Sequence, residues 1–364
     1  MLEISKSAAA GYAGCLLAEL GHQSEGHSQS DVHNQGGILV ERIAVAGDSE
    51  SMGGGLFLHH RKIVRSLTAP KSATAAATAI EDFDVIVEDV GPKGLRSLGW
   101  SYRSLRLLHP KLVIVSVSPF GLKGAYSHWQ GNDFLAQAVG GVMHTSGYDG
   151  EAPMALPGEA AYMIAGLHAA SAALTGVFGA SNTSDQEAVH IDISAQDTFM
   201  QHWTRHVAEY AYSGVTAKRS SRDPEGLHYR HTAMARDGWL YLLALREPWQ
   251  DLAAFLGLGE FLQADAFSND TDLDDSIYTA ATATSEPPWS AMEEAFNTTV
   301  ASKSKYQWFA EAAELGWTFA PLEDPFEIAD SPQVAARGGM VSVSDPASPD
   351  LQVPPLPFRI DEET

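Results

Sequence analysis

Three short runs of β-branched and aliphatic residues constrain the fold of this chain more than any other feature of its sequence. They are Phe83–Glu88 (FDVIVE), Leu112–Ser118 (LVIVSVS) and Val189–Ile193 (VHIDI). A helical stretch around Gly94–His109 separates the first run from the second. Runs of this kind, separated by helices, predict a parallel sheet that is covered on both faces.

The start of the chain has the same strand–helix character. Met1–Ser5 is a short apolar segment, and Ala8–Leu20 is rich in Ala and Leu, with Gly21 as a predicted helix stop. Ile38–Val45 is a further predicted strand. These segments predict an α/β fold with a Rossmann-like first half. No GxGxxG follows the first strand, so a dinucleotide site is not predicted.

A polar, turn-rich stretch at Ser220–Gly226 marks a change in the character of the sequence. Beyond it, Asp237-Gly238 precedes a hydrophobic run, which is typical of a β-hairpin. We therefore expect a large Rossmann-like domain over residues 1–220, completed by residues 331–364. A second, smaller α+β domain is expected over residues 221–330.

The charge of the chain limits its partners. It has 46 Asp and Glu against 23 Lys and Arg, a formal net charge of −23. Such a chain repels phosphate backbones, so nucleic-acid binding is disfavoured, and an anionic ligand would need a local basic patch. A single cysteine, Cys15, excludes an intramolecular disulfide and fits a reducing cytoplasm. No signal peptide is visible at the start, so we expect a cytoplasmic protein.

Two further features have an alternative functional interpretation. Ala160–Ala180 has no formal charge and about the length of a membrane span, but its many small residues favour a buried helix and no membrane partner. The pairs His202 and His206, and His228 and His231, could each offer two imidazoles to a metal. No nearby carboxylate or cysteine completes an evident set of ligands, so no metal site is predicted.

Seven segments, in order along the chain, resemble those of the class III CoA-transferases. This family, of the CaiB/BaiF type, includes formyl-CoA and carnitine-CoA transferases and is related to α-methylacyl-CoA racemase. No single segment is decisive, but the ordered set is fairly specific. The segments are Met1–Leu20, Phe83–Gly99, Tyr102–Gly121, Gly131–Gly141, Gly166–Ala170, His190–Gln196 and Pro332–Gly338.

The resemblance implies a defined fold and chemistry. Enzymes of this family are interlocked homodimers in which CoA lies in a cleft of the large domain. An aspartate attacks an acyl thioester, a mixed anhydride forms and CoA thiolate leaves, which is covalent catalysis by a carboxylate. The implied substrates are an acyl-CoA and a carboxylic acid, with coenzyme A as part of the substrate and no metal.

The family's nucleophilic aspartate is missing from its expected place. It should lie four residues before the glycine of a G-x-x-A-A block, and counting back from Gly166 leads to Tyr162. The nearest carboxylate is Glu159, one helical turn earlier, which either supplies the nucleophile or is a solvated residue at a helix start. In the related racemases a His-Asp pair matches Asn132-Asp133, so the histidine is absent and Asp133 remains. The catalytic candidates are therefore Glu159, Asp133 and Tyr162.

The candidate CoA-binding residues also follow from the resemblance. The family's basic block before its third strand is similar to residues 59–65, in which Lys62 and Arg65 are candidates for phosphate binding. Asp89 and Val90 stand where the family has Asn-Phe near the CoA. The aspartate departs from that pattern and would not favour a phosphate.

These observations predict an enzyme that transfers CoA between a CoA thioester and a carboxylic acid. The missing aspartate favours an alternative, a CoA-binding subunit that lacks the nucleophile and pairs with a catalytic relative. A third possibility is an acyl-CoA racemase, isomerase or lyase that uses Asp133, Tyr162 or His168.

Overall fold

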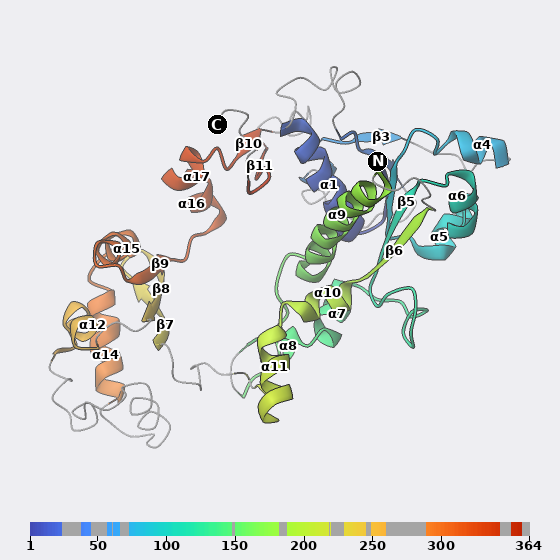
Figure 1. Cartoon of the computed structure of the whole chain (residues 1–364). Coiled ribbons are helices and arrows are strands. Elements are labelled where there is room, and N and C mark those ends of the chain that lie inside the picture. The colour runs from blue at the N-terminus through green and yellow to red at the C-terminus, as the bar shows by residue number, and fades with distance from the viewer. Residues whose placement is uncertain are drawn as a thin grey trace. The chain divides into compact units, whose positions relative to one another are not determined.

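A six-stranded parallel sheet forms the centre of the larger part of the chain (Figure 1). Its strand order is β3-β2-β1-β4-β5-β6, and every neighbouring pair is parallel. The α/β class predicted from the β-branched runs is thereby confirmed. The strands are β1 (Leu2–Ser5), β2 (Glu41–Ala44), β3 (Ile63–Arg65), β4 (Val85–Glu88), β5 (Val113–Ser118) and β6 (Val189–Ser194).

The computed structural model describes residues 1–23, 38–44, 57–59, 61–65, 73–147, 150–181, 188–217, 219, 229–244, 249–259, 289–342 and 351–358. The chain divides into two compact units. The first comprises Met1–Arg219 together with Gly338–Thr364, and the second comprises Ser220–Arg337.

Helices cover both faces of the sheet (Figure 1). Helices α1 and α9 lie on one face, and α4, α5 and α6 lie on the other. The helices of this unit are α1 (Ala8–Gln23), α4 (Ala73–Thr78), α5 (Gly91–Ser97), α6 (Tyr102–Leu108), α7 (Asp133–Val139), α8 (Val142–Thr145), α9 (Ala160–Ser181), α10 (Ala195–Gln201) and α11 (Thr204–Ser213). The unit also contains a short antiparallel pair, β10 (Val341–Ser342) and β11 (Gln352–Val353).

Alternation along the strands divides the core into two layers, because successive side chains of a strand point to opposite faces. Val85 and Val87 pack into the layer that contains α1 and α9. Ile86 packs into the opposite layer, with Leu95 and Trp100. Both layers exclude water, which is why these strands read as continuous apolar runs in the sequence.

Helix α9 approaches α1 closely through small side chains. A Cβ at Gly166 would lie 2.6 Å from the carbonyl oxygen of Ala9, and Ala165 and Ala169 are fully buried. Within the described part of the chain, α9 alone has the length and hydropathy of a membrane span. One of its faces nevertheless lies in the core against α1 and β5.

Two local predictions are wrong. The helical stretch predicted around Gly94–His109 is two helices, because Gly99 has a left-handed φ of 79° and Ser101 caps the start of α6. Gly21 does not stop α1, which continues to Gln23. Gly21 instead permits a close backbone approach, since a Cβ there would lie 2.3 Å from the carbonyl oxygen of Ile38.

The second unit is built around a three-stranded antiparallel sheet with the order β7-β8-β9. The predicted hairpin is confirmed: Ala235 pairs with Gly238 across a two-residue turn. Trp308, Phe296 and Leu240 form the centre of this unit's core. Its elements are β7 (Tyr229–Ala235), β8 (Gly238–Ala244), α12 (Trp249–Phe255), α14 (Trp289–Val300), α15 (Lys305–Glu314), β9 (Thr318–Pro321), α16 (Pro325–Asp330) and α17 (Pro332–Ala336).

Candidate functional site

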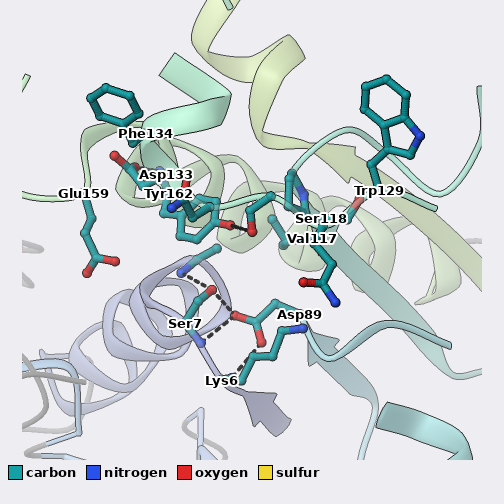
Figure 2. A pocket seen from close by; sticks show the side chains of 15 residues that line it. Lys6, Ser7, Asp89, Val117, Ser118, Trp129, Asp133, Phe134, Glu159 and Tyr162 are labelled. Carbon is teal, nitrogen blue, oxygen red and sulfur yellow. Dashed lines mark hydrogen bonds between the residues drawn. The ribbon is translucent and has the colours of Figure 1, made fainter. Parts of the chain in front are cut away.

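A cavity of about 720 Å³ opens at the carboxyl ends of β1, β4 and β5. The strand order reverses between β1 and β4, and open α/β sheets bind their ligands at such a reversal. The remaining walls come from the segment before α7 and from the start of α9 (Figure 2). The lining residues are Lys6, Ser7, Ala9, Asp89, Val117, Ser118, Pro119, Trp129, Gln130, Gly131, Asn132, Asp133, Phe134, Glu159 and Tyr162.

Asp89 forms the base of the cavity and holds the start of α1. Its carboxylate accepts hydrogen bonds from the backbone N–H groups of Lys6 (2.7 Å) and Ser7 (3.1 Å) and from the Ser7 hydroxyl (Figure 2). It also accepts one from the backbone N–H of Ala10 at 3.3 Å. These donors belong to the turn and first residues of α1, where backbone N–H groups lack helical partners. Burial raises the pKa of Asp89 to about 7, against the opposing effect of its donors. Both oxygens are engaged, so Asp89 has a structural task in this pocket.

Asp133 connects α7 to the start of α9. One oxygen accepts a hydrogen bond from the Tyr162 backbone N–H at 2.8 Å, and the other accepts one from the Gln137 side chain at 2.6 Å. The neighbouring Asn132 caps α7 by accepting a hydrogen bond from the Leu135 backbone N–H. Asn132 and Asp133, which match the racemase block, therefore hold α7 and α9 in place.

Tyr162 stands at the position of the family's aspartate and is buried beside the cavity. Its hydroxyl lies 3.4 Å from the carbonyl oxygen of Gly131. Burial raises the pKa of Tyr162, and the charges of Asp89, Asp133 and Glu159 raise it further. The phenol therefore stays protonated near neutral pH, where it can donate a hydrogen bond but cannot act as a base.

Glu159 is exposed in the wall of the cavity, immediately before α9. Its backbone has a φ of 55°, and the preceding Gly158 has a φ of 77°. The left-handed region is uncommon for a residue with a side chain, and such strain often marks functional sites. Among the described residues, Glu159 is the only non-glycine with a positive φ.

Sequence reasoning missed two residues that stand out in this cavity. Lys6 directly follows β1, and Trp129 lies in the segment between β5 and α7, with its ring stacked on Tyr126 at a centroid distance of 4.4 Å. The rule that ligands bind at the carboxyl ends of parallel strands could have found Lys6. No local pattern marks Trp129.

The other predicted CoA-binding residues lie elsewhere. The Lys62 ammonium is fully buried, 2.6 Å from a Glu3 carboxylate oxygen, and donates to the Gly11 carbonyl at 2.7 Å. Phosphate binding by Lys62 stays a prediction, and this burial disfavours it. Val90 is buried in the layer of the core that contains α5. Arg65 ends β3, and its side chain lies outside the described part of the chain.

Of the histidine pairs considered for a metal, His202 and His206 are not among the residues that line the cavity. His202 Nδ1 contacts the Thr198 carbonyl at 2.9 Å, and His206 Nδ1 contacts Glu209 at 3.1 Å. His228 and the side chain of His231 lie outside the described residues. Over the described ranges, no three His, Cys, Asp or Glu side chains gather closely enough to hold a metal ion.

The fold and the cavity define an α/β protein with a ligand site at the carboxyl ends of its parallel strands, walled by carboxylates. A sequence profile of CoA-transferase family III matches residues 60–364. The chain belongs to this family, as its ordered segments predicted.

Curated relatives of the chain include two CoA-transferases. The chain is 25% identical to a succinate–glutarate CoA-transferase of Agrobacterium fabrum over 71% of its own length and 66% of the relative's. It is also 25% identical to subunit BbsE of the succinyl-CoA:(R)-benzylsuccinate CoA-transferase of Thauera aromatica, over 77% and 67% of the two chains. The chain thus spans about two thirds of the length of these relatives.

Two crystal structures share the fold. A CaiB/BaiF family protein from Brucella suis has a TM-score of 0.77 at 20% identity, covering 100% of this chain and 92% of that one. Rv3272 from Mycobacterium tuberculosis has a TM-score of 0.72 at 16% identity, covering 99% and 92%. At these identities the likeness concerns the fold alone.

Proposed function

We propose that this protein transfers CoA between a CoA thioester and a carboxylic acid, and that Glu159 carries the covalent step. One observation supports this most strongly: Glu159 brings an exposed carboxylate into the cavity beside Tyr162, on a backbone held in the left-handed region. Asp89 and Asp133 line the same cavity, and their hydrogen bonds organise the starts of α1 and α9.

The chemistry balances without an oxidant or a metal. A Glu159 oxygen bonds to the thioester carbonyl carbon, the C–S bond breaks, and CoA leaves as a thiolate. The thiolate attacks the Glu159 carbonyl carbon of the resulting anhydride, which releases the donor acid and leaves a Glu159–CoA thioester. The acceptor carboxylate then reverses both steps, so that a new acyl-CoA leaves and the Glu159 carboxylate is regenerated.

Tyr162 has a supporting role in this scheme. Negative charge develops on the carbonyl oxygen when the carboxylate attacks, and a preorganised donor stabilises that charge. The protonated Tyr162 hydroxyl lines the same cavity as Glu159 and can donate to that oxygen in place of the Gly131 carbonyl, its partner at 3.4 Å. A racemase is less well supported, because it requires two bases at the α-carbon and Asp133 is bound to α9 and Gln137.

The larger unit supplies the proposed CoA-binding part. We assign it a Rossmann-like architecture on the basis of its strand order, and a cytoplasmic setting. We also propose an interlocked homodimer, in which a partner covers the apolar outer face of α9. Leu167, Leu174 and Phe178 are exposed on that face at 50%, 42% and 73%.

A transfer assay tests the proposal directly. Succinyl-CoA and glutarate are a suitable pair, because a relative is named for the corresponding acids. Formation of glutaryl-CoA is measured by chromatography for the wild type, Glu159→Gln and Glu151→Gln. Glu151 is an exposed acid outside the cavity lining and provides a matched loss of charge. We expect Glu159→Gln to lose at least a hundredfold in rate and Glu151→Gln to match the wild type. Equal rates for all three proteins would overturn the proposal.

A second candidate is a CoA-binding subunit without a nucleophile of its own. The observation that favours it is Tyr162, a buried side chain at the family's aspartate position. One relative is itself named as a subunit. In this case the pure chain binds CoA but has no transfer activity, and activity returns only when a catalytic relative is added.

A further inference from the structure

We propose that Lys6 binds the second carboxylate of a dicarboxylic acid substrate and so selects diacids over monoacids. This inference rests on the proposed function, because it concerns the acid used by the same site. Among the described residues that line the cavity, Lys6 is the only Lys or Arg. Its side chain is exposed, whereas the cavity's base is formed by the buried Asp89.

The backbone of Lys6 is fixed although its side chain is exposed. Its N–H donates to Asp89 Oδ1 at 2.7 Å, so the residue cannot move away from the carboxyl end of β1 (Figure 2). This contact involves only the main chain of Lys6, so it does not depend on the ammonium. A substitution at Lys6 can therefore remove the charge without removing the contact with Asp89. The ammonium acts electrostatically on the buried Glu88, where its charge opposes the rise in pKa that burial causes.

The neighbouring basic residues differ from Lys6. On the adjacent part of the sheet, Arg42 and Lys62 both pair with Glu3 inside the protein. Arg61 pairs with Glu19. Their charges are balanced by these pairs, whereas Lys6 lines the cavity with an exposed side chain, and its charge also acts on Glu88 at the end of β4.

The charge balance of the cavity explains why an acid substrate needs this cation. Asp89, Asp133 and Glu159 all line the cavity, on a chain that already carries a net charge of −23. Like charges repel, and the repulsion is stronger at a protein surface than in bulk water. Lys6 supplies the opposite charge that permits an anionic substrate to enter.

The two carboxylates of a diacid differ in what the reaction does to them. The reacting carboxylate loses its charge when it becomes an anhydride or a thioester. The second carboxylate stays ionised in every intermediate, so it requires a cation that remains in place throughout. A lysine whose backbone is held at the carboxyl end of β1 keeps a cation within reach of that carboxylate, and a charge-assisted hydrogen bond to the ammonium is among the stronger polar contacts.

The test compares glutarate with its monomethyl ester, which has one charge fewer at similar length. Binding of each is measured by calorimetry to the wild type, Lys6→Met and Lys6→Arg, and CoA is titrated separately. We expect Lys6→Met to weaken glutarate binding about ten- to a hundredfold. Binding of the monoester and of CoA should change by less than about threefold, and Lys6→Arg should restore most of the affinity for glutarate.

Three results would overturn the inference. Lys6→Met could weaken glutarate and the monoester equally, which would assign Lys6 a role unrelated to the second charge. It could weaken CoA as strongly as glutarate, which would place a CoA phosphate at Lys6. Finally, the wild type could fail to prefer glutarate over the monoester. None of these readouts requires turnover, so a failure of Glu159 as nucleophile would be seen separately in the transfer assay.

Discussion

Glu159 has an unfavourable backbone conformation that the fold maintains. A non-glycine residue in the left-handed region costs about 1–2 kcal/mol, because its Cβ approaches the following carbonyl. Glu159 has this unfavourable conformation, and its side chain lines the cavity. A residue kept for stability alone would be glycine here, as at Gly158. The strain is thus consistent with a carboxylate retained for its chemistry.

The strain leads to a prediction about stability. Glu159→Gly should raise the free energy of unfolding by about 0.5–1 kcal/mol, because relief of strain exceeds the added freedom of the unfolded chain. Glu159→Ala loses the same carboxylate but keeps the strain, so it should be close to the wild type. Urea unfolding of the three proteins measures the difference. A glycine variant less stable than the alanine variant would contradict this account of the backbone.

Asp89 makes stability depend on pH in a defined direction. Its pKa in the folded protein is raised to about 7 from 3.8, so the folded state binds more protons than the unfolded state between about pH 4 and 7. The stabilisation from the protonated carboxyl is complete below about pH 4 and is lost as the pH rises toward 7. Asp89→Asn removes this titration.

We therefore expect the stability of the wild type, relative to Asp89→Asn, to fall as the pH rises from 5 to 7. Urea unfolding of both proteins at the two pH values gives their free energies of unfolding. Subtracting the value of Asp89→Asn from that of the wild type at each pH cancels the contribution of other titrating groups. A difference that grows with pH would show that the donors from Lys6, Ser7 and Ala10 favour the ionised form more than burial opposes it.

At the scale of elements, α9 packs against α1, and both helices begin at the cavity. Their packing therefore positions the residues of the site. Gly166 permits this contact: a Cβ would lie 2.6 Å from the Ala9 carbonyl oxygen and 3.0 Å from the Tyr12 Cβ. Gly179, in the same helix, would place a Cβ with no atom within 4 Å. The two glycines form a matched pair for one substitution.

Gly166→Ala should lower the free energy of unfolding by about 1–3 kcal/mol, because backbone atoms must shift to admit the methyl group. Gly179→Ala should leave it unchanged or raise it by up to about 1 kcal/mol, since alanine favours helix more than glycine does. Chemical unfolding of both variants measures the contrast. Equal effects of the two substitutions would mean that α1 and α9 do not pack as closely as described.

The elements that could be predicted from the sequence are those with a continuous local pattern. β4 and β5 were predictable because strands buried on both faces are apolar at every position. β3 was not, since three residues at a sheet edge carry no periodicity. Lys62 was predicted to bind phosphate, because no local signal shows that it pairs with Glu3 from a distant strand.

The candidate site could be predicted only in part, for a similar reason. Family spacing pointed to Glu159, Asp133, Tyr162 and Asp89, and the fold places all four around one cavity. Their hydrogen-bond partners come from other elements, so the tasks of Asp89 and Asp133 could not be read from spacing. Lys6 was missed because its position depends on which strand ends meet at the cavity.

At the scale of the whole molecule, the outer face of α9 bears on the proposed dimer. Leu167, Leu174 and Phe178 are spaced along one side of the helix and are exposed in the single chain. We expect the wild type to be a dimer and Phe178→Asp to be monomeric at micromolar concentration, because a carboxylate would be buried in the interface. Leu107→Asp, equally exposed but isolated on α6, is the control. Sedimentation velocity measures all three, and a wild-type monomer would contradict the proposal.

The most direct test of the central claim is mass spectrometry of the protein after incubation with succinyl-CoA and hydroxylamine. Hydroxylamine converts an acyl anhydride or a CoA thioester on a carboxylate side chain into a stable hydroxamate. The account predicts a hydroxamate on the peptide that contains Glu159, and its loss in Glu159→Gln. A modified peptide elsewhere, or no adduct despite measurable binding of CoA, would contradict Glu159 as the nucleophile.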